Sequence, residues 1–577
     1  MSSLIIPPGF ILIIGGLLLP FLSDKLKPTA AILFPVLTLI MVWMVTPDHS
    51  LNVGFLDYEL SLLHYTTEGR IFATVFSLAA GIGALFAFKH ASTLELSSAF
   101  VYAGSAIGVT FSGDLLSLFI FWEIMAIGST LVIWANSRAT VSASSESTSY
   151  PANPLALGAS MRYLMVHLLG GVILMIGITT HIATTGSTEI VAMKADNLGT
   201  WLILIGFLVN AGAPPLSSWI ADAYPEASPS GTVFLSAFTT KTAVFALLMC
   251  FPGETILIYV GLYMVFYGII YALLENDMRR ILSYSIVNQV GFMLVAIGIG
   301  SELALNGAAA HAFAHIIYKG LLLMSAGSVL LMTGKRKCTD LGGLFQSMPS
   351  TAINGIIGAL AISAVPLTSG FVTKSLETSA AADAGLSVVW FLLVAASAGV
   401  FLHAGIKFPW FVFFQKDSGL RPPDPPWNMR LAMWMMSGLC IVIGVVPALI
   451  YGILPYALNY EPYTADHVVT QMQLLLFAGF AFFVLLSLMK RTLTISLDFD
   501  WFYRKLIPGL LSKLQLGYAA IMLPLTQFTK EFGKRRFDRL FEVHGPQGIF
   551  ARTWPSASMV LWVAVLLAAS MLLYYLR

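Results

Sequence analysis

The sequence predicts an all-α protein that crosses a membrane many times, and three observations carry this prediction. Hydrophobic residues make up 57% of the 577 residues, and charged residues only 10%. The mean hydropathy is +0.83. Apolar runs of about 18 or more residues, the length that crosses a bilayer, recur along the chain. Together these features exclude an ordinary soluble globular domain.

The apolar runs predict about 14 to 16 transmembrane helices. They lie near residues 4–23, 29–46, 71–88, 97–113, 115–135, 161–184, 200–220, 231–250, 255–274, 280–299, 306–332, 352–382, 388–406, 430–453, 470–489 and 556–576. The first run lacks a positively charged start and a small-residue cleavage site, so we expect a retained span there rather than a signal peptide.

Basic residues gather in alternate loops, as the positive-inside rule requires of a consistent set of spans. One set of loops holds Lys25, Lys27, Lys89, Arg138, Arg279, Arg280, Lys335, Arg336, Lys337, Lys407, Lys416 and the stretch after Lys490. The acidic loops 47–69 and 454–468 fall on the other side. We therefore expect the basic loops to face the cytoplasm and the N-terminus to face outward.

Residues 112–134, SGDLLSLFIFWEIMAIGSTLVIW, form a bilayer-length apolar run that carries Glu123 near its middle. An acidic group at the centre of a membrane helix costs about 2.5–3.5 kcal/mol on insertion scales. Such residues are retained where they pair with other groups or move ions. Glu123 is therefore a candidate functional residue.

Two apolar runs are interrupted by proline and glycine, near 210–230 (NAGAPPLSSWIADAYPEASPSG) and near 365–375 (AVPLTSGFVTK). Proline breaks a helix, and a break at membrane depth survives only inside protein or beside a wet cavity. Matched breaks in two halves of a chain indicate an inverted-repeat transporter with its ion path at the breaks. Ordinary proline kinks are the alternative.

Five further ionisable residues fall within or beside predicted spans. His311, His315 and Lys319 follow an i, i+4, i+8 spacing, which places them on one face of a helix. Lys241 lies midway along another apolar run, and Lys374 follows the second break. Buried groups whose pKa values depend on one another can pass protons. The alternatives are hydrogen bonds between helices and a structural Glu123–Lys241 ion pair.

Other charged residues have simpler interpretations. Asp114, Arg162, Asp222 and Glu226 lie near span ends, where we expect capping or interfacial roles. The serine-rich stretch 140–150 is typical of a flexible connector. Cys250, Cys338 and Cys440 have no metal-ligand spacing, so we expect no disulfide framework and no cysteine-bound metal. The basic, intermittently apolar tail predicts helices in the membrane interface or against a partner.

Four segments carry a family resemblance: GDLLSLFIFWEIMAIGS, PPLSSWIADAYPEASPSGTVFLSAFTTKTAV, NDMRRILSYSIVNQVGFML and HAFAHIIYKGLLLMSAGSV. They resemble the proton-translocating, antiporter-like subunits shared by respiratory complex I and the Mrp multisubunit cation/proton antiporters. With VPLTSGFVTKS and FLHAGIKFPWFVFF, the likeness is greatest to the D subunit of the Mrp type. It covers roughly residues 70–490, with the motifs in the family's order.

The resemblance implies two inverted five-helix repeats, each with a broken helix, inside a larger membrane complex. The segments it implies are 1–95, N-terminal transmembrane helices; 96–275, first antiporter-like repeat; 276–410, second repeat; 411–489, C-terminal transmembrane helices; 490–555, basic interfacial segment; and 556–577, last transmembrane helix.

The resemblance also assigns roles to residues. Glu123 matches the family's essential glutamate, and Lys241 matches the lysine of the helix after the first broken one. The central polar stripe of the family is matched by His311, His315 and Lys319, and the lysine of the second broken helix by Lys374. Asn210 stands where the complex I subunits usually carry a lysine partner for the glutamate. An amide cannot hold a proton charge, so we expect another partner for Glu123, with Lys241 the first candidate.

The function implied is proton translocation in a Mrp-like Na⁺ or K⁺/H⁺ antiporter of a bacterial inner membrane, with partner subunits and without cofactor or metal. A pump module of complex I, a membrane-bound hydrogenase or a carbon-uptake complex shares the same path. A haem protein using His311 and His315 is a third hypothesis, but these two lie on one helix and no CxxCH motif occurs. A non-conducting scaffold is a fourth, and the buried charges argue against it.

Overall fold

The computed structural model describes residues 6–138, 152–487 and 497–576, which divide into two compact units, residues 1–500 and 501–577. Within the described ranges, thirteen helices are long and apolar enough to cross a membrane. Each of the sixteen predicted spans contains at least one helix. The chain is a multi-pass membrane protein, as the composition predicts. The predicted serine-rich connector and the start of the predicted tail lie outside the described residues.

The N-terminal part of the first unit holds six long helices and a hairpin. Its elements are α1 (Pro8–Leu18), α2 (Lys27–Met44), β1 (Leu51–Phe55), β2 (Tyr58–Leu63), α3 (Thr67–Ala87), α4 (Thr93–Thr110), α5 (Leu115–Ala135) and α6 (Leu155–Thr185). The two strands pair antiparallel. The hairpin falls in the predicted acidic loop 47–69, where no strand was expected.

The middle of the unit contains the first broken span and the central helices. These are α7 (Leu198–Ala211), α8 (Trp219–Ala223), the 3₁₀ turn η2 (Tyr224–Glu226), α9 (Gly231–Ala237), α10 (Thr239–Cys250), α11 (Ile256–Leu274), α12 (Met278–Ile299) and α13 (Glu302–Thr333). The predicted span 231–250 is therefore two helices that meet at Phe238, rather than one continuous helix.

The last part of the unit contains the second broken span and two π-helical segments. Its main elements are α14 (Pro349–Ile362), α15 (Ser369–Asp383), α16 (Ser387–Val400), the π-helices η5 (Phe401–Lys407) and η6 (Trp410–Phe414), α17 (Trp427–Val445), α18 (Ala448–Tyr451) and α19 (Ala465–Val484). The second unit comprises η7 (Phe502–Leu506), α20 (Ile507–His544), η8 (Ile549–Ala551) and α21 (Ser556–Tyr575).

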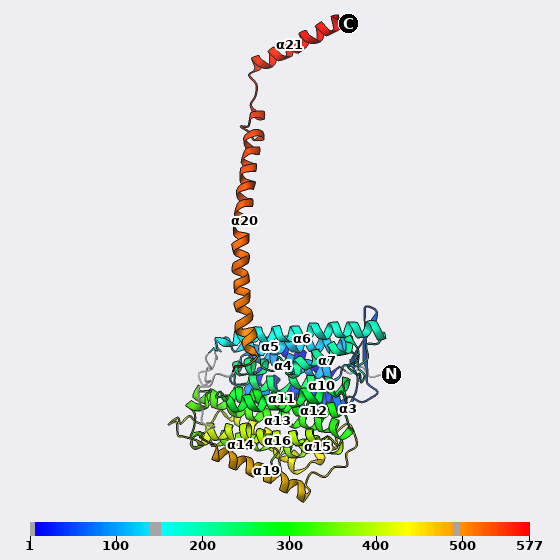
Figure 1. Cartoon of the computed structure of the whole chain (residues 1–577), viewed down its shortest axis with the longest axis vertical. Helices are drawn as coiled ribbons and strands as arrows, with labels where there is room; N and C mark the ends of the chain where they lie inside the picture. The colour runs from blue at the N-terminus through cyan, green and yellow to red at the C-terminus, as the bar shows by residue number, and fades with distance from the viewer. Residues whose placement is uncertain (1–5, 139–151, 488–496, 577) are drawn as a thin grey trace. The chain divides into compact units, whose positions relative to one another are not determined.

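In the first unit α12, α13 and the α9–α10 pair form the centre of the bundle. In the apolar 18-residue stretch of each, 100% of the residues of α12, 94% of those of α9–α10 and 83% of those of α13 are buried, against 44% for α6 and 17% for α19. Figure 1 shows α6 along one edge of this unit and α19 along the opposite edge. Polar residues such as Gln289, His311 and Lys319 lie fully buried on the central helices, and the exposed apolar surfaces of α6 and α19 remain for lipid or partner subunits.

Both predicted helix breaks occur. The first span stops at Ala211, passes a left-handed Gly212 (φ +80°) and the Pro214–Pro215 pair, and resumes at Trp219. The second stops at Ile362 and resumes at Ser369, with Ala364 (φ +57°) in the left-handed region. Residues other than glycine rarely adopt this conformation, so the surrounding structure must hold it.

Candidate functional site

A fully buried carboxylate in the second half of the bundle was missed by the sequence prediction. Glu377 on α15 has no exposed surface, and both of its oxygens lie 2.9 Å from Nδ1 of His311 on α13. Gly307 on α13 permits the approach, because a Cβ there would lie 3.1 Å from Cγ of Glu377. A buried histidine and carboxylate in hydrogen-bond contact can hold a proton between them.

The other ring nitrogen of His311 faces α12 and its own helix. Nε2 lies 2.8 Å from the Tyr318 hydroxyl and 3.2 Å from Oε1 of Gln289, and the Tyr318 hydroxyl lies 3.0 Å from the same Oε1. All three side chains are fully buried. Both nitrogens of His311 thus have partners within the protein, which leaves neither for the haem considered above.

The remaining members of the predicted stripe lie on the same helix. Lys319 Nζ donates to the Ser285 hydroxyl at 2.8 Å, and a longer contact of 3.4 Å joins it to the carbonyl of Leu282. His315 is fully buried, and neither of its ring nitrogens has a hydrogen-bond partner. The structure therefore confirms one polar face on α13, with partners mostly from α12.

Lys374, beside the second predicted break, and Lys241, beside the junction of α9 and α10 at Phe238, make the same kind of contact. Lys374 Nζ donates at 2.8 Å to the carbonyl of Ile362, the last residue of α14. Lys241 Nζ donates at 2.8 Å to the carbonyl of Ser236, near the end of α9, and at 3.0 Å to the hydroxyl of Thr240. A helix end leaves carbonyls without partners. In each half a buried lysine satisfies one of them.

Glu123 lies against α6. A Cβ on Gly171 would lie 2.0 Å from Oε1 of Glu123, and this buried oxygen has no hydrogen-bond partner. The adjacent Gly170 faces Asn210, whose two amide atoms are also buried without partners. Glu123 and Asn210 therefore flank two neighbouring glycines of α6.

The structure places no direct hydrogen bond between Glu123 and Lys241, since the amine donates to Ser236 and Thr240 instead. A series of buried hydroxyls lies in the same half of the unit. Tyr163 on α6 donates to Ser129 on α5 at 3.0 Å and lies 3.1 Å from Thr239 on α10. The partnership of Glu123 and Lys241 expected from the sequence is thus not a direct one.

The sequence predicts Lys407 in a basic loop, where its charge would be solvated. In the structure its side chain is fully buried. Its Nζ donates to the carbonyls of Ala272, Leu273 and Glu275 at 2.6, 2.5 and 3.0 Å, at the end of α11. His403, one turn earlier in the π-helix, is also fully buried. Lys407 therefore caps α11, because its ammonium has three donors for three carbonyls.

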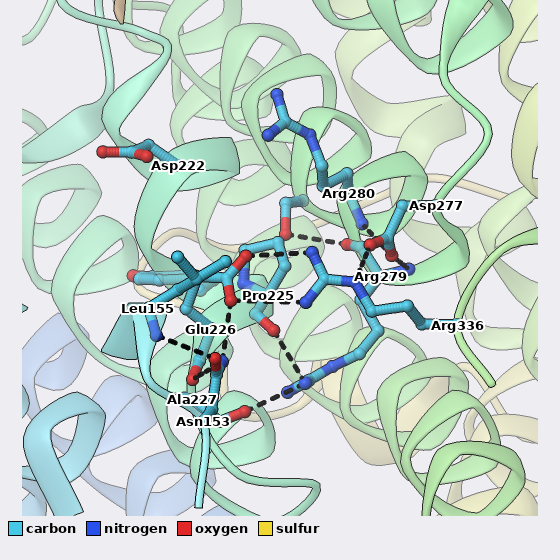
Figure 2. A network of polar contacts seen from close by, with 12 residues as sticks. Asn153, Leu155, Asp222, Pro225, Glu226, Ala227, Asp277, Arg279, Arg280 and Arg336 are labelled. Carbon is cyan, nitrogen blue, oxygen red and sulfur yellow. Dashed lines mark hydrogen bonds and ion pairs between the residues drawn. The ribbon is translucent and has the colours of Figure 1, made fainter. Parts of the chain in front are cut away.

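Loops that carry basic residues meet in one polar network (Figure 2). Arg336 hydrogen-bonds Glu226 at 2.9 Å and contacts Asp277, while Arg279 donates to the carbonyls of Pro225 and Ala227 at 2.8 and 2.9 Å. These contacts tie the end of the first broken span to the loops before α12 and after α13. Two of the predicted basic loops, those of Arg279 and Arg336, thus lie at the same end of the bundle.

The network changes the acidity of its carboxylates, which lie outside the membrane-spanning helices. Burial pushes the pKa of Glu226 up, but the hydrogen bond and charge of Arg336 outweigh it, so the pKa lies below its ordinary value. Burial raises the pKa of Asp277, even though the charge of Arg336 opposes this shift. Arg336 is thus the cation on which both carboxylates depend.

Of the charges predicted near span ends, Asp114 has the expected capping role, whereas Arg162, Asp222 and Glu226 are held in ion pairs. Asp114 is the N-cap of α5 and accepts from the backbone of Leu116 and Ser117. Arg162 and Asp222 form a two-point ion pair with contacts of 2.7 and 2.9 Å. Within the described ranges, no group of three His, Cys, Asp or Glu side chains has a geometry that could hold a metal ion.

The family described as NADH:quinone oxidoreductase/Mrp antiporter, TM, matches residues 112–401, which is half of the chain. The chain belongs to this family. The match begins at the start of the Glu123 run and ends in the first π-helix, so it contains every candidate residue named from the sequence. The family resemblance stated from the motifs is therefore confirmed.

Individual relatives are similar at lower coverage. The chain is 29% identical over 375 residues to the A/B component of a probable K⁺/H⁺ antiporter of Rhizobium meliloti, covering 60% of this chain and 36% of the relative. It is 29% identical over 287 residues to the D component of a Na⁺/H⁺ antiporter of Alkalihalophilus pseudofirmus, covering 46% and 55%. The matches thus span about a third and about half of these relatives.

A solved structure has the same fold. A chain of the Mrp complex from Dietzia sp. DQ12-45-1b superposes with a TM-score of 0.70 at 19% identity, covering 98% of this chain and 62% of that chain. The superposition includes the helices on which the buried ionisable residues lie.

Proposed function

We propose that this protein is the proton-translocating component of a Mrp-like multisubunit antiporter, which exchanges a monovalent cation, Na⁺ or K⁺, for protons. The observation that carries the proposal is the series of ionisable groups in both halves of one bundle, from the half-buried Glu123 through the fully buried Lys241 to the fully buried His311–Glu377 pair. Groups so costly to bury are retained in membranes for ion transport. The antiporter components named among the relatives support the same assignment.

In this mechanism protons move along side chains of the chain itself. Lys241, His311, His315, Lys319 and Lys374 are the groups predicted from the sequence, with Glu123 as the carboxylate of the first half. Glu377 is the added member. A proton arriving at one group repels the charge of the next, so loading one site favours unloading of its neighbour.

The helix breaks suit this role. Lys241 and Lys374 each donate to a carbonyl at the end of an interrupted helix. A charged amine at such a carbonyl is held by a neutral group, so that it can lose its proton without breaking a direct ion pair. Direct ion pairing between Glu123 and Lys241 is not required by the mechanism.

Substitution tests the proposal. In vesicles that contain the assembled complex, Glu123→Ala and Lys241→Ala should each reduce cation/proton exchange to below about a tenth of wild type. The matched controls are Glu189→Ala and Lys416→Ala, which remove exposed charges of the same kind outside the bundle centre. Retained exchange in both test variants, with the complex intact, contradicts the proposal.

The same proton path serves a redox-driven pump, because the family name covers both assemblies. Purification of the complex distinguishes them: antiporter components without redox cofactors support the proposal, and co-purifying iron–sulfur or hydrogenase proteins contradict it. We place the complex in a bacterial inner membrane with the basic loops in the cytoplasm. Cysteine accessibility at Lys335→Cys from either side of the membrane tests this orientation.

A further inference from the structure

The hydrogen-bond acceptor that faces His311 is fixed by a chain of amides. The backbone carbonyl of Val265 can only accept, so Asn288 must turn its NH₂ group toward it, at 2.8 Å. Oδ1 of Asn288 then accepts from the NH₂ group of Gln289. Oε1 of Gln289 must therefore face His311 and Tyr318, and this oxygen can only accept.

Glu377 fixes the tautomer at the opposite side of the ring. When the His311–Glu377 pair holds one proton, it lies between Nδ1 and the carboxylate, and Nε2 carries a bare lone pair. When the pair holds two protons, Nε2 carries a proton, whether the other one sits on Nδ1 or on the carboxylate. The state of Nε2 therefore reports the proton count of the pair.

The Tyr318 hydroxyl has one proton and two possible acceptors in this triangle. It donates to Nε2 across 2.8 Å in the one-proton state. In the two-proton state Nε2 is itself a donor, and the hydroxyl donates to Oε1 of Gln289 across 3.0 Å. One rotation of a hydroxyl thus satisfies both states, which matters because an unmade hydrogen bond is costly in a buried site.

We propose that Tyr318 and Gln289 form a hydrogen-bond switch that stabilises the one-proton and the two-proton states of the His311–Glu377 pair in turn. This inference rests on the proposed proton-translocating function and adds two positioning residues to it. Tyr318 favours the one-proton state as a donor, and Gln289 favours the two-proton state as an acceptor. Their removal should act in opposite directions.

Other charges around the pair are common to every variant of the test. The ionisable groups on the surrounding helices are Glu377 and Lys374 on α15, His315, Tyr318 and Lys319 on α13, Lys241 on α10 and Cys440 on α17, while α12 presents Gln289 and the ring of Phe292. Tyr318→Phe removes a neutral hydroxyl, and Gln289→Leu removes a neutral amide. Because neither substitution adds or removes a charge, the surrounding charges cannot produce shifts of opposite sign.

The experiment measures cation/proton exchange against pH in vesicles that contain the whole complex. Tyr318→Phe leaves the one-proton state without its hydrogen-bond donor, so the pH of half-maximal exchange should rise by about one unit. Gln289→Leu leaves the two-proton state without its acceptor, so the pH of half-maximal exchange should fall by about the same amount. The control residue Tyr284 lies on the same helix as Gln289, but its hydroxyl donates to Asp498. Tyr284→Phe should therefore leave the pH of half-maximal exchange unchanged.

Each result decides the inference. Opposite shifts support it, whereas unchanged values, or shifts in the same direction, overturn it while the proposed function stands. A wild-type complex without exchange at any pH overturns the proposed function and this inference with it. If Gln289→Leu does not assemble, Gln289→Met, which has nearly the same shape and no acceptor oxygen, takes its place with the same expected shift.

Discussion

Both carboxylate oxygens of Glu377 lie 2.9 Å from Nδ1 of His311 in a fully buried site. This contact joins α15, which follows the second helix break, to the central helix α13. The second broken span therefore contacts the polar face of α13 through an ionisable side chain, that of Glu377.

Glu377→Gln tests the need for a group that can bind a proton. The amide retains an oxygen that accepts from Nδ1 of His311 but has no carboxylate to protonate. Exchange should fall to below about a tenth of wild type, while the complex assembles as before. Proton-coupled cation transport in vesicles measures this. Glu302→Gln, an exposed glutamate in the first turn of α13, should keep wild-type exchange.

Gly171→Ala tests the placement of Glu123. The added methyl group would lie 2.0 Å from Oε1 of Glu123, so the carboxylate must move away. A displacement of this size at a reacting group slows transfer by about tenfold or more. The measurement is exchange by a complex of normal composition. Gly158→Ala, at an exposed position on the same helix, is the control, and equal rates in the two variants would contradict the assignment.

Lys407→Met tests the cap of α11. The substitution leaves three carbonyls of Ala272, Leu273 and Glu275 without their donor, at about 1–3 kcal/mol for each group that stays buried and unsatisfied. The melting temperature of the detergent-solubilised protein should fall by several degrees. Lys416→Met, at an exposed position nearby, should melt as wild type. Equal melting of both variants would remove the structural role given to Lys407.

Arg336→Met tests the network of Figure 2 and its dependence on pH. The pKa of Glu226 is lowered in the folded protein, so the stability from its pairing with Arg336 is present above the ordinary glutamate pKa and is lost as the pH falls through the folded value. The difference in stability between wild type and variant should be large at pH 7 and smaller at pH 3, which lies below the ordinary glutamate pKa. Lys335→Met, at the exposed neighbouring position, should show little difference at either pH.

The fold was largely predictable because helices that cross a membrane require long runs of apolar residues, which are visible in the sequence. Apolar length located the spans, and proline located the breaks after Ala211 and Ile362. The hairpin 51–63 and the break at Phe238 were missed. Neither contains a proline or an unusual apolar run, and each contacts a residue distant in the sequence: Ser61 of the hairpin donates to Asp114, and Phe238 packs on Tyr102.

The site was predictable only in part. Charged residues within apolar runs can be recognised from the sequence, but the residues that they contact cannot. Glu377 falls within the predicted span 352–382, and the argument that singled out Glu123 applied to it equally. Lys407 was assigned to a loop, because π-helices extended its span beyond the apolar run. The contact of Lys374 with Ile362 could not be predicted, as it requires the coordinates of the break.

The hydrogen bonds of Lys241 and Lys374 to the ends of interrupted helices link the charge of each amine to the position of a helix end. A hydrogen bond from a charged ammonium is roughly twice as strong as one from a neutral amine. In the proposed mechanism Lys241 and Lys374 lose protons during transport, and their hydrogen bonds to the carbonyls of Ser236 and Ile362 then weaken. A change of charge in the interior would therefore also loosen the ends of two interrupted helices.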